Sequence, residues 1–185
     1  MVKPQNRCTW AQGPEMIKYH DSEWGIPVHN DKKLFEMLIL EGAQAGLSWS
    51  TILKRRKTYR AAFDNFDPKK ISKYTQKDTA RLLSDEGIIR NKLKIKSTIN
   101  NAKQFLIIQQ EFGSFDRYMW DFVQGIPIKN NFKDMSNVPA STILSDLISK
   151  DLKKRGFSFV GTTIIYAFMQ AVGMTNDHTK NCFRH

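Results

Sequence analysis

Four residues near the two ends of the chain have the side chains and the spacing of a metal site. They form two pairs, Cys8 with His20 and His178 with Cys182. The second pair is close enough in sequence to ligate one ion, and a loop could close the longer gap in the first pair. Two thiolates and two imidazoles are a common structural zinc set, in which the protein fills every coordination position. Such an ion would tie together two ends that would otherwise fray.

The same four residues also fit two arrangements without a metal. One is a Cys8–Cys182 disulfide, which a reducing cytosol disfavours. The other is a pair of unrelated buried thiols with incidental histidines nearby. The chain has only two cysteines in 185 residues, so a disulfide framework is excluded.

Glu41 is a carboxylate in an apolar setting. It lies in the run 39–47, which is mostly apolar or small, and its helical neighbours Leu38 and Ala45 are apolar. We therefore expect it to be partly buried, which is costly for an unpaired carboxylate. Either a structural partner such as Gln44 or a capping amide satisfies Glu41, or the carboxylate is held ready for a ligand.

Aromatic residues gather in the first fifty positions of the chain. Three of the four tryptophans, Trp10, Trp24 and Trp49, lie there together with Tyr19. They could form a small core, or they could form a stacking pocket for a flat ligand such as a nucleobase. Aromatic faces attract cations, and a carboxylate accepts hydrogen bonds from an amine, so the cluster and Glu41 together suit a flat, cationic, amine-bearing ligand.

The formal net charge of +11 indicates a polyanionic partner. Basic residues occur in three runs, at 54–57, 90–96 and 150–155, each next to a turn. Each run could be a solvated helix face, but together they favour phosphate contacts. The third run leads into a turn bounded by Gly156 and Gly161. Such a turn exposes backbone N–H groups at a helix N-terminus, and the hydroxyls of Thr162 and Thr163 could add donors to a phosphate.

The elements that must position these residues are helices. Apolar residues recur with helical period nearly throughout, and helix starts are expected at Asn30 or Asp31, Ser48, Asp67-Pro68 and Thr75, and at Ser114, Ser141 and Thr162. The stretch from Ile126 to Pro139 is expected to be a loop, and no convincing strand pair is visible. We therefore predict an all-α protein forming one domain over 1–185.

The sequence also bounds the location of the protein. No apolar stretch is long enough to span a membrane, and Met1 to Arg7 contains no apolar core of a secretory signal. We expect a cytoplasmic protein without a membrane partner, and a monomer.

Several long motifs of the sequence resemble those of 3-methyladenine DNA glycosylase I, a bacterial enzyme of the helix-hairpin-helix superfamily. The resemblance extends over essentially Arg7 to Cys182. Its stretches are Arg7 to Trp10, Tyr19 to Gly25, Leu34 to Met37, Leu40 to Trp49, Gly87 to Arg90, Leu152 to Thr163, Tyr166, Phe168 to Ala171, and Asn176 to His178.

The resemblance implies a helix-hairpin-helix DNA glycosylase fold with its hairpin near 152–171 and its termini tied by zinc. It implies hydrolysis of the N-glycosidic bond of 3-methyladenine in alkylated double-stranded DNA, after the base is flipped out. The family's residue roles would then fall on several sets. Structural zinc would bind Cys8, His20, His178 and Cys182. Glu41, ionised, would contact the adenine edge, and Tyr19 and Trp49 would be the aromatic walls of the pocket, with Trp10 and Trp24 as further lining. Gly46-Leu47 would be the wedge, the loop that enters the gap left by the flipped base, and Gly156, Gly161, Thr162 and Thr163 would form the DNA-binding hairpin.

Asp177 departs from the superfamily pattern. The superfamily places a catalytic aspartate after its hairpin helix, and Asp177 lies closer to the hairpin than that pattern expects. Because it adjoins His178, we expect a cap or a partner of that histidine. Two other function classes stay open: a non-catalytic, zinc-stabilised DNA-binding module, and a zinc hydrolase, which needs an open coordination position.

Overall fold

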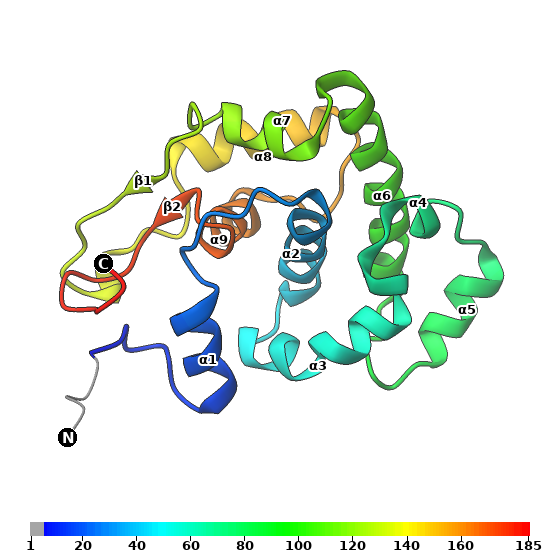
Figure 1. Cartoon of the computed structure of the whole chain (residues 1–185). Helices are drawn as coiled ribbons and strands as arrows, with labels where there is room; N and C mark the ends of the chain where they lie inside the picture. The colour runs from blue at the N-terminus through cyan, green and yellow to red at the C-terminus, as the bar shows by residue number, and fades with distance from the viewer. Residues whose placement is uncertain (1–5) are drawn as a thin grey trace.

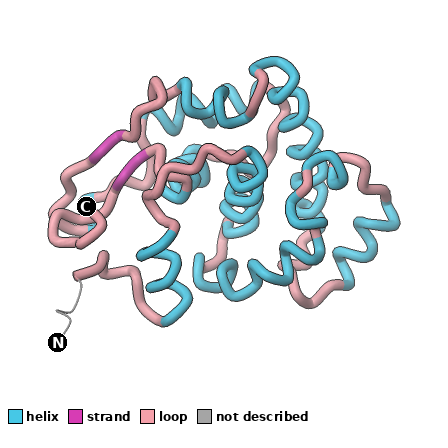
Figure 2. Tube along the Cα trace, viewed as in Figure 1, coloured by secondary structure: helices cyan, strands magenta, loops and turns pink. Residues whose placement is uncertain are grey.

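The computed structural model describes residues 6–185 and is built mainly of helices joined by short loops (Figures 1 and 2). The first five residues, which belong to the segment where no secretory signal is expected, lie outside the described residues. The elements in chain order are α1 (Pro14–Ser22), α2 (Asp31–Gln44), α3 (Trp49–Ala62), η1 (Asp64–Phe66), α4 (Pro68–Ile71), α5 (Gln76–Ser84), α6 (Lys92–Phe112), α7 (Phe115–Asp121), β1 (Ile128–Lys129), η2 (Met135–Asn137), α8 (Ile143–Lys154), α9 (Thr162–Ala171) and β2 (Thr175–Asn176). No helix within 6–185 is long and apolar enough to cross a membrane.

The helix starts expected from capping residues are confirmed except at Ser141, where Thr142 is the N-cap of α8 instead. Asn30 accepts a hydrogen bond from the backbone of Lys33, and Ser48 accepts one from the backbone of Thr51. Asp67 likewise accepts from two backbone amides of α4. These side chains satisfy backbone N–H groups that have no partner inside the helix. Since α2 ends at Gln44 and α3 begins where its cap predicts, the segment 45–48 between them is fixed at both ends.

Helix α2 lies at the centre of the molecule, beside α9 (Figure 1). It also packs against α3, α6 and α7. Every residue from Leu34 to Ala43 is buried, including both carboxylates in that span. The helix is therefore covered on all sides, and Glu41 is buried because its helix is.

Two features differ from the expectation. The gap between Cys8 and His20 is spanned partly by helix α1, which begins with proline at its first turn after Gly13, rather than by a loop alone. A parallel strand pair also exists, in which Ile128 pairs with Thr175. It is only two residues long on each strand, so it leaves no alternating pattern in the sequence.

The turn between α8 and α9 is held by side chains of α6. Asn101 donates to the backbone carbonyl of Ser158 and accepts from its N–H, at 2.8 and 2.9 Å. Asn100 donates to the carbonyl of Gly156, which has a φ of +88° that favours glycine. The turn also packs on α2, where a Cβ at Gly42 would lie 3.3 Å from Phe159. The hairpin and the helix that carries Glu41 are thus in direct contact.

Candidate functional site

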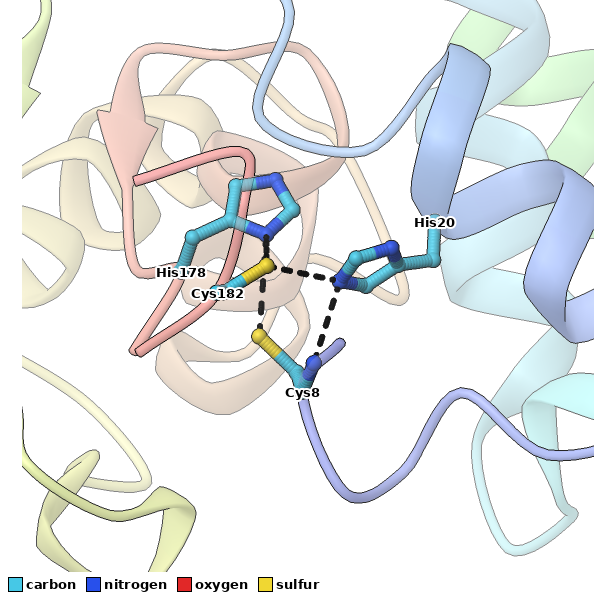
Figure 3. Close-up of side chains that lie close together, drawn as sticks. All are labelled: Cys8, His20, His178 and Cys182. Atoms are coloured by element: carbon cyan, nitrogen blue, oxygen red, sulfur yellow. Dashed lines mark hydrogen bonds between the residues drawn. The ribbon is translucent and has the colours of Figure 1, made fainter. Parts of the chain in front are cut away.

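The four predicted metal ligands come together in the structure. Their donor atoms all lie within 4.8 Å of one another, and all four side chains are buried. Figure 3 shows His178 and Cys182 on the C-terminal segment, Cys8 on the N-terminal loop and His20 on α1. The cluster therefore joins the two ends of the chain, as the sequence predicts.

The geometry of the cluster fits a tetrahedral metal ion. Bond lengths typical of zinc with sulfur and nitrogen require S···N edges of about 3.5 Å in a tetrahedron. The Nδ1 of His178 is 3.6 Å from the Sγ of Cys8 and 3.3 Å from that of Cys182. The Nε2 of His20 is 3.4 Å from the Sγ of Cys182. Four protein donors at these separations could hold one ion and leave no coordination position open.

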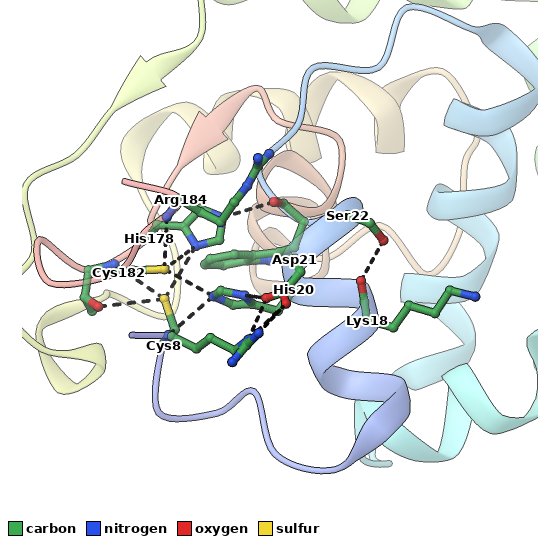
Figure 4. A network of polar contacts seen from close by, with 11 residues as sticks. Cys8, Lys18, His20, Asp21, Ser22, His178, Cys182 and Arg184 are labelled. Carbon is green, nitrogen blue, oxygen red and sulfur yellow. Dashed lines mark hydrogen bonds and ion pairs between the residues drawn. The ribbon is translucent and has the colours of Figure 1, made fainter. Parts of the chain in front are cut away.

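The ring nitrogens that face away from the cluster are fixed by hydrogen bonds (Figure 4). The Nδ1 of His20 lies 2.8 Å from Asp21, and Arg7 in turn holds that carboxylate at 2.8 Å. The Nε2 of His178 lies 3.1 Å from the backbone carbonyl of Trp24. Such partners orient metal-binding histidines and select their tautomer. Burial lowers the pKa of His178 to about 4, so the imidazole is neutral, as a ligand must be.

A cavity of about 270 Å³ lies beside this cluster. It contains all five residues that the sequence assigned to a base pocket, from α1, α2, α3 and the neighbouring loops. Its walls are Trp10, Met16, Tyr19, Trp24, Glu41, Gln44, Trp49, Met135, Ala167 and Gln170. The Tyr19 and Trp49 rings are 5.4 Å apart, and those of Trp10 and Trp24 are 5.0 Å apart. The aromatic cluster is thus a pocket wall, although Trp24 and Tyr19 also belong to the core.

Five wall residues were not expected, namely Met16, Gln44, Met135, Ala167 and Gln170. Met16 lies one helical turn before Tyr19, so the missed helix α1 explains its omission. Met135 comes from the central loop, whose sequence has no helical or strand period. Met16, Met135 and Ala167 are apolar residues of ordinary type, and nothing in their local sequence marks a pocket. Gln170 lies in the motif 168–171 that carries the family resemblance, and this is the one sequence signal that could have pointed to it.

Glu41 is the buried carboxylate of the cavity, with 4% of its surface exposed. Within 6–185 no group donates a hydrogen bond to it, and Gln44, its suggested partner, instead donates to the carbonyl of Leu47. Burial raises the pKa of Glu41 to about 8, so in the free protein the carboxyl holds its proton at neutral pH. The ionised carboxylate predicted from the sequence is therefore expected only when a cation occupies the cavity.

The indole N–H of Trp49 is a second polar group without a partner. It is buried, and no acceptor lies within reach among the described residues. Buried donors without acceptors are uncommon and call for an explanation. The cavity thus offers a ligand one carboxyl group and several aromatic faces, one of them the ring of Trp49.

Within 6–185 Asp177 neither caps a helix nor hydrogen-bonds to the ring of His178, so both expectations for it are wrong. Its fully buried carboxylate accepts four hydrogen bonds, from donors on α9, β2 and the central loop. The donors are Tyr166, Gln170, Thr175 and Asn130. Asp177 is not part of the cavity wall, and its acceptor positions are occupied. It therefore ties α9 to the loop and is not placed to touch a base in the cavity.

Each of the three basic runs places one cation inward. Arg56 is buried and paired with Glu36 at 2.6 Å. Lys94 donates to the backbone carbonyls of Ala43 in α2 and of Ala45 just after it, and Arg155 pairs with Asp151 at 2.8 Å. These three cations already have protein partners, so the other members of each run are the better candidates for the expected phosphate contacts. Sequence reasoning could not separate the two kinds because all are charged residues on helices.

The predicted wedge lies at a tight turn after α2. Leu47 is 37% exposed, and its N–H donates to the carbonyl of Gln44 at 2.7 Å. Gly46 has a φ of +77°. Ala45 and Gly46 have the dihedral pattern of a type II turn, which requires glycine or asparagine at its third position.

The hairpin residues occupy the expected places. Helix α9 begins at Thr162 with Gly161 as N-cap, and no side chain caps it within the described residues. The Thr162 hydroxyl lies 2.8 Å from that of Ser145. The backbone N–H groups at the start of α9 are the kind that bind phosphate.

A helical fold with a base-sized aromatic cavity, a buried carboxylate in it and a basic surface defines the class of DNA glycosylases. The sequence from residue 10 to residue 185 matches the methyladenine glycosylase family. The chain belongs to this family.

Curated relatives and solved structures agree with this membership. DNA-3-methyladenine glycosylase 1 of Escherichia coli (strain K12) is 51% identical over 177 residues, covering 95% of each chain. The 3-methyladenine DNA glycosylase I of Staphylococcus aureus is 35% identical and superposes with a TM-score of 0.94, covering 97% of this chain and 96% of that one. A further crystal structure of 3-methyladenine DNA glycosylase I, 50% identical, gives a TM-score of 0.95 over 97% of this chain and 100% of that one.

Proposed function

We propose that this chain hydrolyses the N-glycosidic bond of 3-methyladenine in double-stranded DNA. The observation that carries the proposal is a buried, unpaired Glu41 in an aromatic cavity. The Escherichia coli relative is named for this activity, and a similar solved structure is of a complex with 3-methyladenine. Family membership and cavity chemistry therefore agree on the substrate.

Recognition follows from the charge of the lesion. Methylation at N3 leaves the base positively charged while it is bonded to the sugar. Tyr19 and Trp49 stack on the flipped base, and Trp10 and Trp24 line the cavity beside it. Glu41 accepts a hydrogen bond from the adenine amine. Because a cation stabilises the carboxylate form, binding of the lesion lowers the pKa of Glu41, and the carboxyl releases its proton.

The reaction needs little acid catalysis. As the bond from the sugar C1′ to the base breaks, its electron pair moves to the base, which leaves neutral. Water supplies the oxygen that bonds to C1′ and loses a proton. None of the residues that line the cavity is a lysine. An amine for a Schiff base is therefore missing at the wall, which supports a monofunctional hydrolase.

The DNA contacts are proposed on two segments. Gly46 and Leu47 enter the gap left by the flipped base. Gly156, Gly161, Thr162 and Thr163 bind backbone phosphate as the hairpin of a helix-hairpin-helix fold. The whole of 1–185 acts as one glycosylase domain, monomeric and cytoplasmic.

Zinc is the metal that best fits the four-residue cluster. Cys8, His20, His178 and Cys182 would hold it, and it would supply a cross-link between the ends of the chain without chemistry at the sugar. Because the donors fill a tetrahedron, the zinc-hydrolase alternative loses its open position. The alternative of a non-catalytic DNA-binding module needs no cavity with a buried carboxylate, and the chain has one.

The test is release of 3-methyladenine from methylated duplex DNA by wild type and Glu41→Gln. Wild type is expected to release the base. The amide keeps the shape of the side chain but cannot become an anion, so we expect base release to fall by about 100-fold with duplex binding retained. An exposed carboxylate, Glu15, provides the matched control Glu15→Gln, which should match wild type. Wild-type protein that releases no methylated base refutes the enzymatic proposal, and equal rates in E41Q refute the role of Glu41.

A further inference from the structure

Lys94 ends on the backbone of another helix rather than in solvent. Its Nζ lies 2.7 Å from the carbonyl oxygens of both Ala43 and Ala45. These carbonyls belong to the end of α2, where the last carbonyls have no partner inside the helix. Lys94 projects from the first turn of α6 and is half-buried, and no carboxylate lies within ion-pair distance of it among the described residues. The ammonium group of Lys94 therefore interacts with the C-terminal end of α2, where the helix dipole favours a cation.

The contact falls where α2 passes into the predicted wedge. Ala45 is the first central residue of the turn that presents Leu47, and Gly46 is the second. Gln44 closes the same turn from within, since its Nε2 donates to the carbonyl of Leu47 at 2.8 Å. Lys94 is the side chain from outside α2 that holds Ala45. The turn is thus fixed at its base by a residue 49 positions away in the sequence.

We propose that Lys94 is a positioning residue that holds the Gln44–Leu47 turn in place for insertion into duplex DNA. The inference rests on the proposed function, in which Leu47 fills the gap left by the flipped base. Loss of the ammonium leaves two carbonyls without their donor and frees the turn to shift. Without Lys94 the turn must become ordered before Leu47 can enter the duplex. The free energy of this ordering opposes insertion and base flipping, and it does not oppose binding of the base in the cavity.

The experiment compares binding to two duplexes, one undamaged and one containing a stable abasic site that Leu47 can fill. The ratio of the two affinities measures insertion, because phosphate contacts are common to both. For Lys94→Met we expect this ratio and the single-turnover rate of base release to fall by about 10-fold. Affinity for free 3-methyladenine, followed by tryptophan fluorescence, is expected to stay within about twofold of wild type, because Glu41 and the aromatic walls lie outside the turn and Gln44 alone of the wall residues lies in it.

Lys92→Met is the matched control. Lys92 lies on the same turn of α6, carries the same charge and is exposed. Its loss is expected to weaken both duplexes alike and to leave the ratio unchanged. Lys94→Arg, whose guanidinium can still donate to both carbonyls, is expected to recover most of the ratio. It also keeps the test valid should K94M fold poorly.

Two results would overturn the proposal. One is a K94M protein that binds both duplexes with an equal loss, as K92M does, which would make Lys94 an ordinary phosphate contact. The other is a folded K94M or K94R protein in which free-base affinity falls as much as the ratio, which would mean that the pocket itself depends on Lys94. Failure of the proposed function is separate, because it is an absence of base release by wild type.

Discussion

His178 and Trp24 join the cluster of two cysteines and two histidines to the wall of the base cavity. The Nε2 of His178 lies 3.1 Å from the Trp24 carbonyl, and the two rings meet edge-to-face with centroids 4.6 Å apart. Gly25 permits this approach, since a Cβ there would lie 3.1 Å from the His178 ring and the residue has a φ of +74°. The cluster and the cavity are therefore one packed unit, and damage to either should affect the other.

Removal of the metal is expected to weaken both the fold and the pocket. Without an ion the cluster leaves two thiols and two imidazoles buried without their ligand, and the ends of the chain lose a cross-link. We expect a strong chelator to lower the melting temperature by more than about 10 °C and to reduce affinity for free 3-methyladenine. Readdition of zinc should restore both. Protein that binds the base equally well with and without metal would show that the pocket does not depend on the cluster.

Glu41→Gln is expected to stabilise the protein at high pH. The pKa of Glu41 in the folded state is about 8, against an ordinary value of 4.5. A carboxyl with a raised folded pKa contributes its full stability below about pH 4.5 and loses it as the pH rises through about 8. The amide cannot ionise. The variant should therefore gain up to about 4 kcal/mol on wild type between pH 5 and 9.

Denaturant unfolding of both proteins across this pH range measures the difference. All other titrating groups are common to the two proteins and cancel. A difference that stays constant from pH 5 to pH 9 would mean that Glu41 does not titrate in this window.

The activity of the wild type is expected to rise with pH, whereas the stability contributed by Glu41 falls with pH. The complex with the cationic lesion holds Glu41 as an anion, so below about pH 8 the free enzyme must release one proton in reaching that complex. We expect kcat/KM for methylated DNA to rise about tenfold per pH unit below pH 8 and then to level off. In E41Q this rise should be absent. A wild-type profile without a rise toward pH 8 would contradict the role of Glu41 as an anionic acceptor.

The sequence predicted the chemistry of the site better than its position in space. Capping residues such as Asn30 and Ser48 located helices because their hydrogen bonds are local. The apolar setting of Glu41 correctly indicated burial. The direction of Arg56 or Lys94 could not be predicted, since it depends on helices that meet only in the fold. Met135 was missed because its loop is held by contacts with the C-terminal segment, which leave no periodic signal.

Asp177→Asn is expected to destabilise the protein without changing the chemistry of base release. The carboxylate is fully buried and accepts from four donors, including Tyr166 and Asn130. An amide nitrogen would face two of these donors, which costs about 2–4 kcal/mol. The melting temperature should fall by about 5–15 °C. The exposed Asp121 offers the matched control Asp121→Asn, which should be neutral.

The rate of base release at low temperature decides between structure and catalysis at Asp177. Single-turnover release by folded D177N is expected to remain within about threefold of wild type, because Asp177 is not part of the cavity wall. A loss of 100-fold or more in protein that is still folded would instead assign it a direct part in the reaction.

Gly161→Ser tests whether the start of α9 binds phosphate. Gly161 has a φ of −61°, and a Cβ there meets no atom within 4 Å, so serine fits without strain. Serine at an N-cap accepts a hydrogen bond from a backbone N–H of the first turn. It would then occupy a donor that a phosphate needs, while the helix keeps its stability. We expect an unchanged or slightly raised melting temperature, unchanged affinity for free 3-methyladenine, and duplex affinity reduced by about threefold to tenfold. A G161S protein that binds duplex DNA as wild type does would mean that these N–H groups do not bind phosphate.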